Sequence, residues 1–189
     1  MPSHDVSAGQ LRATQTNPDR DPMDFYPTPV GFTRALLDRV PLKGRVWEPA
    51  AGDGAIVAVL KEYGYRVCGT DITHTPSEDF LTSNRRAKSI VTNPPYRLCT
   101  EFIRHGLAQT DGILCLLLAS FHMSGKNRAA EFFFPVPPSD LIYVLDKMAV
   151  LGKTSVFNHV WFVWDKDYHG PTRFHWALVP KGERGEAYG

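Results

Sequence analysis

The segment Asn93-Pro94-Pro95-Tyr96 combines residue types that could activate an amino group. It follows a short apolar run, so we expect it to end a strand and border the edge of a sheet. The prolines stiffen the loop and lack N–H donors, which leaves the Pro94 carbonyl and the Asn93 amide oxygen to accept hydrogen bonds from an –NH2 group. Tyr96 adds a flat face for stacking. Such a loop could aim the delocalised lone pair of the amino nitrogen by positioning alone. The alternative is an ordinary proline turn capped by asparagine.

A second segment, residues 46–55, has the pattern of a strand, a glycine turn and the start of a helix. Gly52 and Gly54 would let the backbone approach a ligand closely at the helix N-terminus. Val57 occupies the third glycine position of the dinucleotide fingerprint, which disfavours nicotinamide cofactors. Asp71 ends the next strand about 20 residues further on, where such folds place a carboxylate against ribose hydroxyls. Together the turn and Asp71 favour an adenosine-containing cofactor without saying which one.

The elements that must position these residues alternate along the chain. Apolar spacing predicts helices and strands in the order of an α/β fold, with a largely parallel, doubly wound sheet and ligands at the carboxyl ends of its strands. The last two strands are joined by a short connection, which allows an antiparallel pair. The predicted strands are residues 45–48, 65–71, 89–92, 113–119, 141–145 and 159–165, and the predicted helices are residues 29–40, 55–63 and 99–108.

Composition sets broad limits on the class of protein. The 189 residues, 43% of them hydrophobic, favour one domain with a substantial core. We find no apolar run long enough to cross a membrane and no signal peptide, and three scattered cysteines argue against disulfides and a zinc site, so we expect a cytoplasmic protein. The histidines have no metal-ligand spacing, so no metal is expected. A net charge of +1 neither supports nor excludes nucleic acid as a partner.

Taken together, the chain resembles the class I S-adenosylmethionine-dependent amino-methyltransferases, and most closely the small phage and prophage DNA adenine-N6 methyltransferases. The resemblance covers residues 24–166, with the cofactor motifs before the catalytic motif, as in the gamma arrangement. It implies a Rossmann-like, mostly parallel seven-stranded sheet with an antiparallel final strand, in a single methyltransferase domain over residues 24–179. Residues 1–23 would be a flexible arm and residues 180–189 a tail. The matching motifs are residues 24–29 (DFYPTP), 48–54 (EPAAGDG), 67–71, 79–80, 93–96 and 159–166.

The resemblance also implies roles for individual residues, with S-adenosylmethionine as the cofactor. Asp71 would hold the ribose, and Asp79 with Phe80 would contact the adenine ring. Asn93 and Pro94 would bind the target amine, with Pro95 in the catalytic loop and Tyr96 stacking on the base. Phe157 is the candidate that clamps a flipped base, although it could equally be a core residue of the late strand. The remaining cofactor contacts would come from Tyr26, Thr28, Pro29, Glu48, Pro49, Ala50, Gly52, Gly54, Ile72 and Asn93.

The substrate that this resemblance favours is adenine N6 in duplex or single-stranded DNA, in a bacterial or phage-infected cell. RNA and the glutamine side chain of a protein are alternatives, because an amide nitrogen has the same delocalised lone pair. The glutamine methyltransferases generally have an N-terminal helical domain, and residues 1–23 form only a short polar arm. A non-catalytic cofactor-binding module is a further alternative. We see no separate target-recognition domain, so recognition would come from the N-terminal arm, residues 121–140 or residues 146–158.

Overall fold

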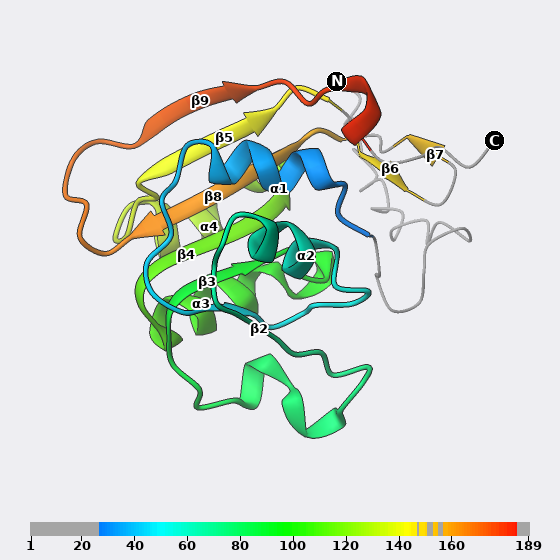
Figure 1. Ribbon diagram of the computed structural model, residues 1–189. Coiled ribbons are helices and arrows are strands. Elements are labelled where there is room, and N and C mark those ends of the chain that lie inside the picture. The colour runs from blue at the N-terminus through cyan, green and yellow to red at the C-terminus, as the bar shows by residue number, and fades with distance from the viewer. Residues whose placement is uncertain (1–26, 147, 151–152, 155–156, 185–189) are drawn as a thin grey trace, which may run out of the picture.

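The computed structural model describes residues 27–146, 148–150, 153–154 and 157–184, with backbone alone for residues 149–150 and 153–154. Its centre is a seven-stranded sheet in the order β2-β1-β3-β4-β8-β5-β9 (Figure 1). All six strands and three helices expected from the sequence form within a few residues of the predicted bounds. The strands of the sheet are β1 (Val46–Glu48), β2 (Val67–Gly69), β3 (Ala87–Thr92), β4 (Thr110–Ala119), β5 (Asp140–Val144), β8 (His159–Asp165) and β9 (Arg173–Ala177).

The sheet is parallel except at one strand. β1, β2, β3 and β4 run parallel to one another, β8 is antiparallel to both β4 and β5, and β9 is parallel to β5. The antiparallel strand is therefore the expected one at residues 159–165, but it is not the final strand. β9 extends the sheet beyond it, and it escaped the sequence pattern because only Ala177 of its five residues is buried. A small hairpin of β6 (Ala149–Val150) and β7 (Lys153–Thr154) lies in the connection between β5 and β8.

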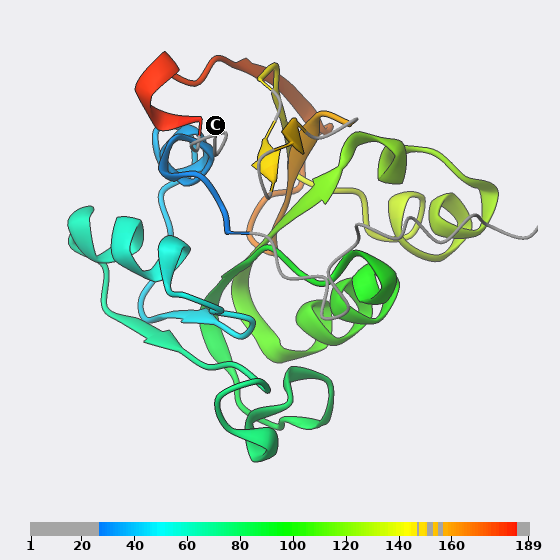
Figure 2. The ribbon, with the colours of Figure 1, turned by 90° about the vertical axis from the view of Figure 1, so that its right-hand side faces the viewer.

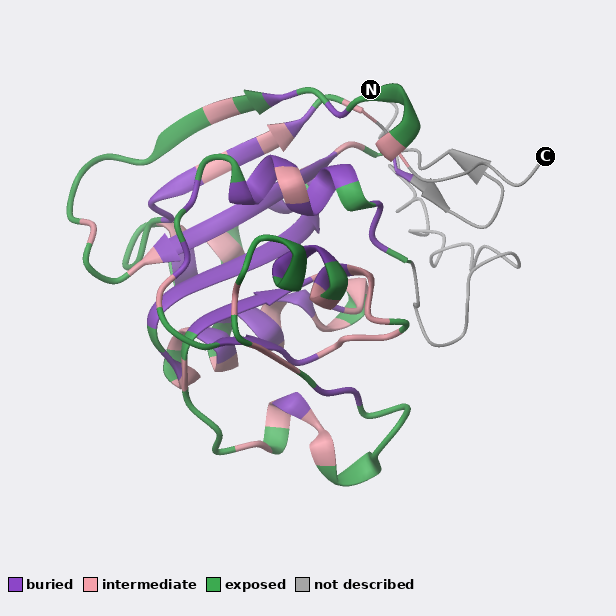
Figure 3. Ribbon diagram, in the orientation of Figure 1, coloured by how far each residue is buried: buried purple, intermediate pink, exposed green. Residues whose placement is uncertain are grey.

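Helices cover both faces of the sheet (Figure 2). On one face, α1 (Val30–Leu37) and α2 (Ala55–Glu62) bury residues such as Leu36 and Leu60 in one core cluster. On the other face, α3 (Cys99–Gln109) and the helical segment that starts with α4 (Lys126–Arg128) bury Phe102 and Phe132 in a second cluster. β4 lies between the clusters and is buried along almost its whole length, as Figure 3 shows. Both layers thus hold the carboxyl ends of β1, β3 and β4 in fixed positions.

The segment that follows β9 packs on α1 instead of leaving the fold. Residues 181–183 form a 3₁₀ turn, and Glu183 pairs with Arg34 of α1 at 2.6 Å. Gly31 allows this approach, because a Cβ there would lie 2.2 Å from a methyl carbon of Val179. The first residues of the expected tail therefore hold α1 in place. In the part of the chain that the structure describes, no helix is long and apolar enough to cross a bilayer.

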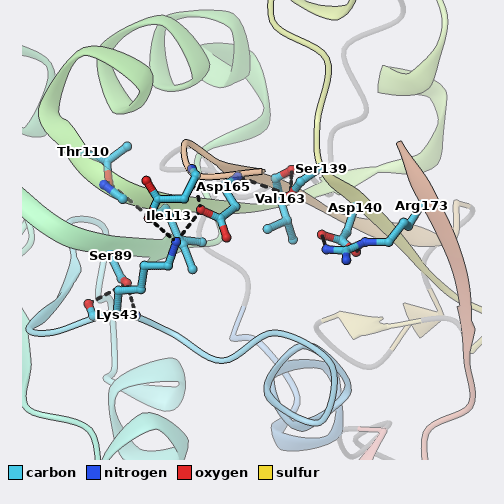
Figure 4. Close-up of polar contacts among 11 residues, drawn as sticks. Lys43, Ser89, Thr110, Ile113, Ser139, Asp140, Val163, Asp165 and Arg173 are labelled. Carbon is cyan, nitrogen blue, oxygen red and sulfur yellow. Dashed lines mark hydrogen bonds and ion pairs between the residues drawn. The ribbon is translucent and has the colours of Figure 1, made fainter. Parts of the chain in front are cut away.

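The amino edge of the sheet is closed by ion pairs (Figure 4). The Lys43 ammonium bridges Asp165 at 2.5 Å and Asp167 at 2.8 Å. Asp140, only 4% exposed, accepts hydrogen bonds from Arg173 at 2.8 and 2.9 Å. Burial alone would raise the pKa of Asp140, but the hydrogen bonds from Arg173 and His175 outweigh it and hold that pKa below its usual range. Because these charges satisfy one another, this edge is built for stability, and the opposite edge is the candidate for chemistry.

Candidate functional site

A cavity of about 340 Å³ opens at the carboxyl edge of β1, β2 and β3. Its size is within the range of small-molecule sites, and open α/β sheets bind their ligands at this edge. The cavity therefore brings together motifs that are far apart in the sequence. Of the residues predicted to bind cofactor or substrate, those that line it are Thr28, Pro49, Ala50, Asp71, Ile72, Asp79, Phe80, Asn93 and Pro95.

The glycine turn after β1 forms one end of this site. Gly52 and Gly54 have φ values of 51° and 86°, in the left-handed region that residues with a Cβ adopt only with strain. Gly54 precedes α2 directly, so the turn leads into the helix N-terminus, where unpaired N–H groups favour negative or polar ligand groups. The Gly52 N–H donates to the Asp71 carboxylate at 2.8 Å, which ties the turn to the end of β2.

Asp71 presents a charged acceptor to the cavity. Its other carboxylate oxygen accepts hydrogen bonds from the Thr73 N–H at 2.8 Å and the Thr73 hydroxyl at 2.6 Å. Burial alone would raise the pKa of Asp71, but the hydrogen bonds from Thr73 and Gly52 lower it further than burial raises it. A carboxylate has about four lone-pair sites, and protein groups use three of them here. The group therefore stays ionised and keeps capacity for a ligand hydroxyl.

Glu48 ends β1 with its side chain fully buried, and unlike Pro49 and Ala50, which follow it, it does not line the cavity. One carboxyl oxygen accepts a hydrogen bond from the Ala50 N–H at 3.2 Å, whereas Oε2 has no hydrogen-bond partner among the described residues. Desolvation raises the pKa of Glu48 to about 8, the Thr92 hydroxyl and the Ala50 N–H limit this rise, and the charge of Asp71 adds to it. Without a nearby positive charge, Glu48 is therefore mostly a neutral acid at pH 7. A cationic ligand group would favour its ionised form.

An aromatic wall forms the other end of the cavity. Asp79 accepts a hydrogen bond from the Leu81 N–H at 2.9 Å, which caps the 3₁₀ turn Phe80–Thr82. Phe80 is 2% exposed, with its ring 5.2 Å from Trp47 and 4.8 Å from Phe102 between ring centroids. Phe102 of α3 also lines the cavity, although no motif in the sequence indicated it. This wall offers an apolar surface beside a carboxylate, an arrangement that suits a flat heterocycle carrying an amino group.

The predicted catalytic loop lies where β3 ends. Asn93 and Pro95 line the cavity, whereas Pro94 is buried behind them. The Asn93 amide Nδ2 donates to the hydroxyl of Thr28, 65 positions earlier in the chain, at 3.1 Å. This hydrogen bond sets which way the amide faces and turns Oδ1 away from Thr28. The residues immediately before α1 and the loop after β3 thus form one unit.

Two aromatic residues with predicted roles, Tyr96 and Phe157, do not line the cavity. The Tyr96 hydroxyl is 2.8 Å from Nε2 of His159, the first residue of β8. Phe157 is 48% exposed, so it lies outside the buried core, and its ring is 5.0 Å from that of Phe121. No local pattern in the sequence connects His159 with a tyrosine 63 positions earlier, so the sequence alone does not predict this contact.

The other predicted site residues lie around the cavity or outside the described part. Pro29 is the N-cap of α1 and is buried, and Gly52 and Gly54 line a second hollow on the outer side of their turn. Tyr26 lies outside the described residues. The structure adds Thr73, Arg97 and Phe102 to the lining of the main cavity. Arg97 directly follows the predicted catalytic tetrapeptide, so its position in the sequence was the one available signal.

Known structures share this arrangement of strands and helices. The chain superimposes with a TM-score of 0.59 and 13% identity on a Vibrio vulnificus protein assigned as the modification subunit of a type I restriction enzyme, covering 87% of this chain and 51% of that one. A Listeria monocytogenes protein assigned to the class I S-adenosylmethionine-dependent methyltransferases superimposes with a TM-score of 0.55 and 15% identity. The match covers 89% of this chain and 68% of that one. The fold is that of the class I methyltransferases.

A chain from a type I restriction–modification system has the same fold, with a TM-score of 0.58 and 14% identity over 84% of this chain and 46% of that chain. The present chain therefore spans about half the length of the two restriction–modification relatives. No protein-family model matches the sequence, and no curated protein matches it. At these identities the likeness establishes the fold alone.

Proposed function

We propose that this protein transfers a methyl group from S-adenosylmethionine to an amino nitrogen, and that its substrate is adenine N6 in DNA. One observation carries the proposal. A single cavity is lined by Asp71 and Phe80 at its cofactor side and by Asn93 of the catalytic loop. A cofactor held by the first two residues would therefore end beside the group that binds the target nitrogen, as direct transfer between them requires.

The cavity fits the proposed cofactor in size and in chemistry. The ionised Asp71 suits ribose hydroxyls, and the wall of Phe80 and Phe102 suits the adenine ring. Glu48, with a buried carboxyl oxygen that no described group satisfies, suits the positive charge of the methionine part. When bound, S-adenosylmethionine would supply a methyl group made electrophilic by its sulfonium. The donor set therefore matches a ribonucleoside that carries a cationic amino-acid chain.

The chain's own part in the reaction is to position and polarise the target amine. The Asn93 amide oxygen and the Pro94 carbonyl accept its hydrogen bonds and hold the nitrogen toward tetrahedral geometry, which makes the lone pair available. Thr28 keeps the Asn93 amide in the required orientation through its 3.1 Å hydrogen bond. Tyr96 stacks on the ring that bears the amine. Orientation supplies the rate enhancement, and no strong base takes part.

DNA is the substrate that the surroundings of the loop favour. Phe121 and Phe157 are 44% and 48% exposed, and such side chains next to a catalytic loop suit a base that has left its stack. The fold is shared with chains of type I restriction–modification systems, which supports a DNA substrate. Residues 121–140, the predicted insertion, carry Lys126 and Arg128 and are a candidate for contacts with the DNA phosphate backbone.

Transfer of labelled methyl from S-adenosylmethionine to unmethylated duplex and single-stranded DNA, followed by nucleoside analysis, tests this proposal. We expect N6-methyladenine as the labelled product. Label in 4-methylcytosine would keep the amino-methyltransferase activity and change the base. Cofactor binding without label in either form of DNA would refute the DNA assignment, and RNA and glutamine-containing proteins would then be assayed under the same conditions.

The Asp71→Ala variant is expected to weaken S-adenosylmethionine binding roughly 10- to 100-fold, because hydrogen bonds to a charged group are worth about 1.5–3 kcal/mol. Isothermal titration calorimetry measures the effect. Asp111→Ala is the matched control, since Asp111 pairs with the exposed Arg86 away from the cavity and should leave the affinity unchanged. Equal affinities of Asp71→Ala and the wild type would show that the ribose lies elsewhere.

The Phe157→Ala variant is expected to raise the KM for DNA about tenfold while leaving the affinity for S-adenosylmethionine unchanged. The reason is that base–aromatic stacking is worth about 1–3 kcal/mol. Steady-state kinetics with varied DNA concentration would measure it. Trp176→Ala is the control, because Trp176 is 60% exposed but lies on β9, at the far edge of the sheet. If both variants change KM equally, Phe157 has no specific role in binding the base.

A further inference from the structure

Tyr96 is fixed at its far end by a residue from the other half of the sheet. Its hydroxyl lies 2.8 Å from Nε2 of His159, and the two rings lie 5.9 Å apart with 32° between their planes. Tyr96 begins a 3₁₀ turn directly after Pro95, so its backbone is attached to a loop. The hydrogen bond with His159 therefore ties the tip of a loop side chain to a strand.

His159 is a rigid anchor for this purpose. It is 1% exposed and begins β8, where its backbone is paired with Ala119 of β4 on one side and Val144 of β5 on the other. The edge of its ring packs against Phe32 of α1, with centroids 6.2 Å apart. Two strands and a helix thus hold the imidazole, and its position does not depend on the catalytic loop.

The chemistry of the imidazole indicates a role beyond packing. Nδ1 of His159 is buried without a hydrogen-bond partner among the described residues, which is costly for stability. Burial lowers the pKa of His159 to about 4, and the nearby His122 contributes, so the ring is neutral at physiological pH. A neutral ring can bind the phenol as donor or as acceptor, depending on its tautomer. An apolar residue would fill the space at less cost to folding, so the polar ring is better explained by its contact with Tyr96.

We propose that His159 is a positioning residue that fixes the ring of Tyr96 as the platform for the substrate base. The inference rests on the proposed function, because it gives Tyr96 the stacking role. Without the hydrogen bond, the hydroxyl end of the Tyr96 ring is no longer tied to β8, and the angle between the base and Asn93 is less well fixed. Transfer then falls because fewer bound substrates reach the reactive geometry.

The test compares His159→Leu, His159→Gln and Tyr96→Phe, with His175→Gln at the amino edge as a matched control. His159→Leu and Tyr96→Phe should each lower kcat/KM on DNA roughly tenfold, the effect of one hydrogen bond, with unchanged affinity for S-adenosylmethionine. His159→Gln places a donor near the original Nε2 and should restore most of the activity. The double variant His159→Leu/Tyr96→Phe should also lose roughly tenfold, because both changes remove the same interaction.

A purely structural role predicts a different result. In the proposed case, the Tm of His159→Leu is equal to or above that of the wild type, because the unpaired buried nitrogen is gone. A roughly hundredfold loss in the double variant, wild-type activity of His159→Leu, or equal losses for leucine and glutamine would each overturn the proposal. If His159→Leu does not fold, the comparison of His159→Gln with Tyr96→Phe decides, since only the latter should lose activity.

Nuclear magnetic resonance separates this inference from the proposed function. In ¹⁵N-histidine-labelled protein, the Nε2 resonance of His159 should shift in Tyr96→Phe and stay in place in Phe157→Ala. If the wild type transfers no methyl to DNA, the proposed substrate fails while this measurement still tests the hydrogen bond. An unchanged Nε2 resonance in Tyr96→Phe would overturn the positioning role regardless of the substrate.

Discussion

Replacement of Asn93 by alanine is expected to lower kcat for methyl transfer by at least about 10²–10³-fold, the usual cost of removing one acceptor or donor aimed at the reacting group. The variant loses the amide oxygen that draws the target nitrogen out of conjugation, and the Pro94 carbonyl alone cannot fix its geometry. The affinity for S-adenosylmethionine should stay within a fewfold, because Asp71 and Phe80, which line the cavity, remain in place.

Single-turnover transfer to DNA and calorimetric binding of the cofactor measure the two effects separately. Asn84→Ala is the matched control, since Asn84 is an exposed asparagine in the loop before β3. Loss of cofactor binding parallel to the loss of kcat would contradict the assigned role and indicate that Asn93 holds the cofactor. Identical behaviour of Asn93→Ala and the wild type in every assay would instead favour a cofactor-binding module without catalysis.

Replacement of Glu48 by glutamine is expected to stabilise the ligand-free protein by about 3 kcal/mol at pH 7. The pKa of Glu48 is about 8 in the folded protein against 4.5 for the free side chain, so the folded state binds this proton more tightly than the unfolded state does. The stability that the protonated group contributes is complete below pH 4.5 and is lost as the pH rises to about 8. Glutamine is neutral at every pH and avoids this loss.

Urea unfolding of the ligand-free proteins at pH 5 and pH 8 checks this prediction. The difference between Glu48→Gln and the wild type should be small at pH 5 and largest at pH 8. Glu62→Gln is the control, because the Glu62 side chain is 56% exposed and its pairing with Arg34 should contribute little. A difference that does not change with pH would show that Glu48 is not protonated in the folded protein.

The same variant should bind S-adenosylmethionine more weakly, because glutamine cannot offset the positive charge of the methionine part. Stability and binding would then change in opposite directions. Such an exchange is typical of a functional group kept at a cost to folding. A glutamine variant that is more stable and binds the cofactor as tightly as the wild type would remove Glu48 from the proposed cofactor site.

Local elements follow from the sequence because their signals are local. The alternating apolar residues of positions 159–165 define β8 to the residue, and the glycine turn places the start of α2 at Ala55. The loop of Asn93 follows β3 because an apolar run ends there. Asp71 likewise lies just after the next strand of the motif, two residues beyond the end of β2. Periodicity and turn chemistry depend on neighbouring residues, so the chain by itself determined these elements and the edge of the sheet where the cavity opens.

Only the tertiary structure decided which distant residues meet. The contacts of Thr28 with Asn93 and of Tyr96 with His159 each join positions more than 60 residues apart. β9 was missed because an edge strand with one buried residue lacks the two-sided apolar pattern of β4. The high pKa of Glu48 arises from its complete burial, which depends on the strands around it. Spacing along the chain cannot predict such contacts, because they depend on strand order and on which side chains the packed layers cover.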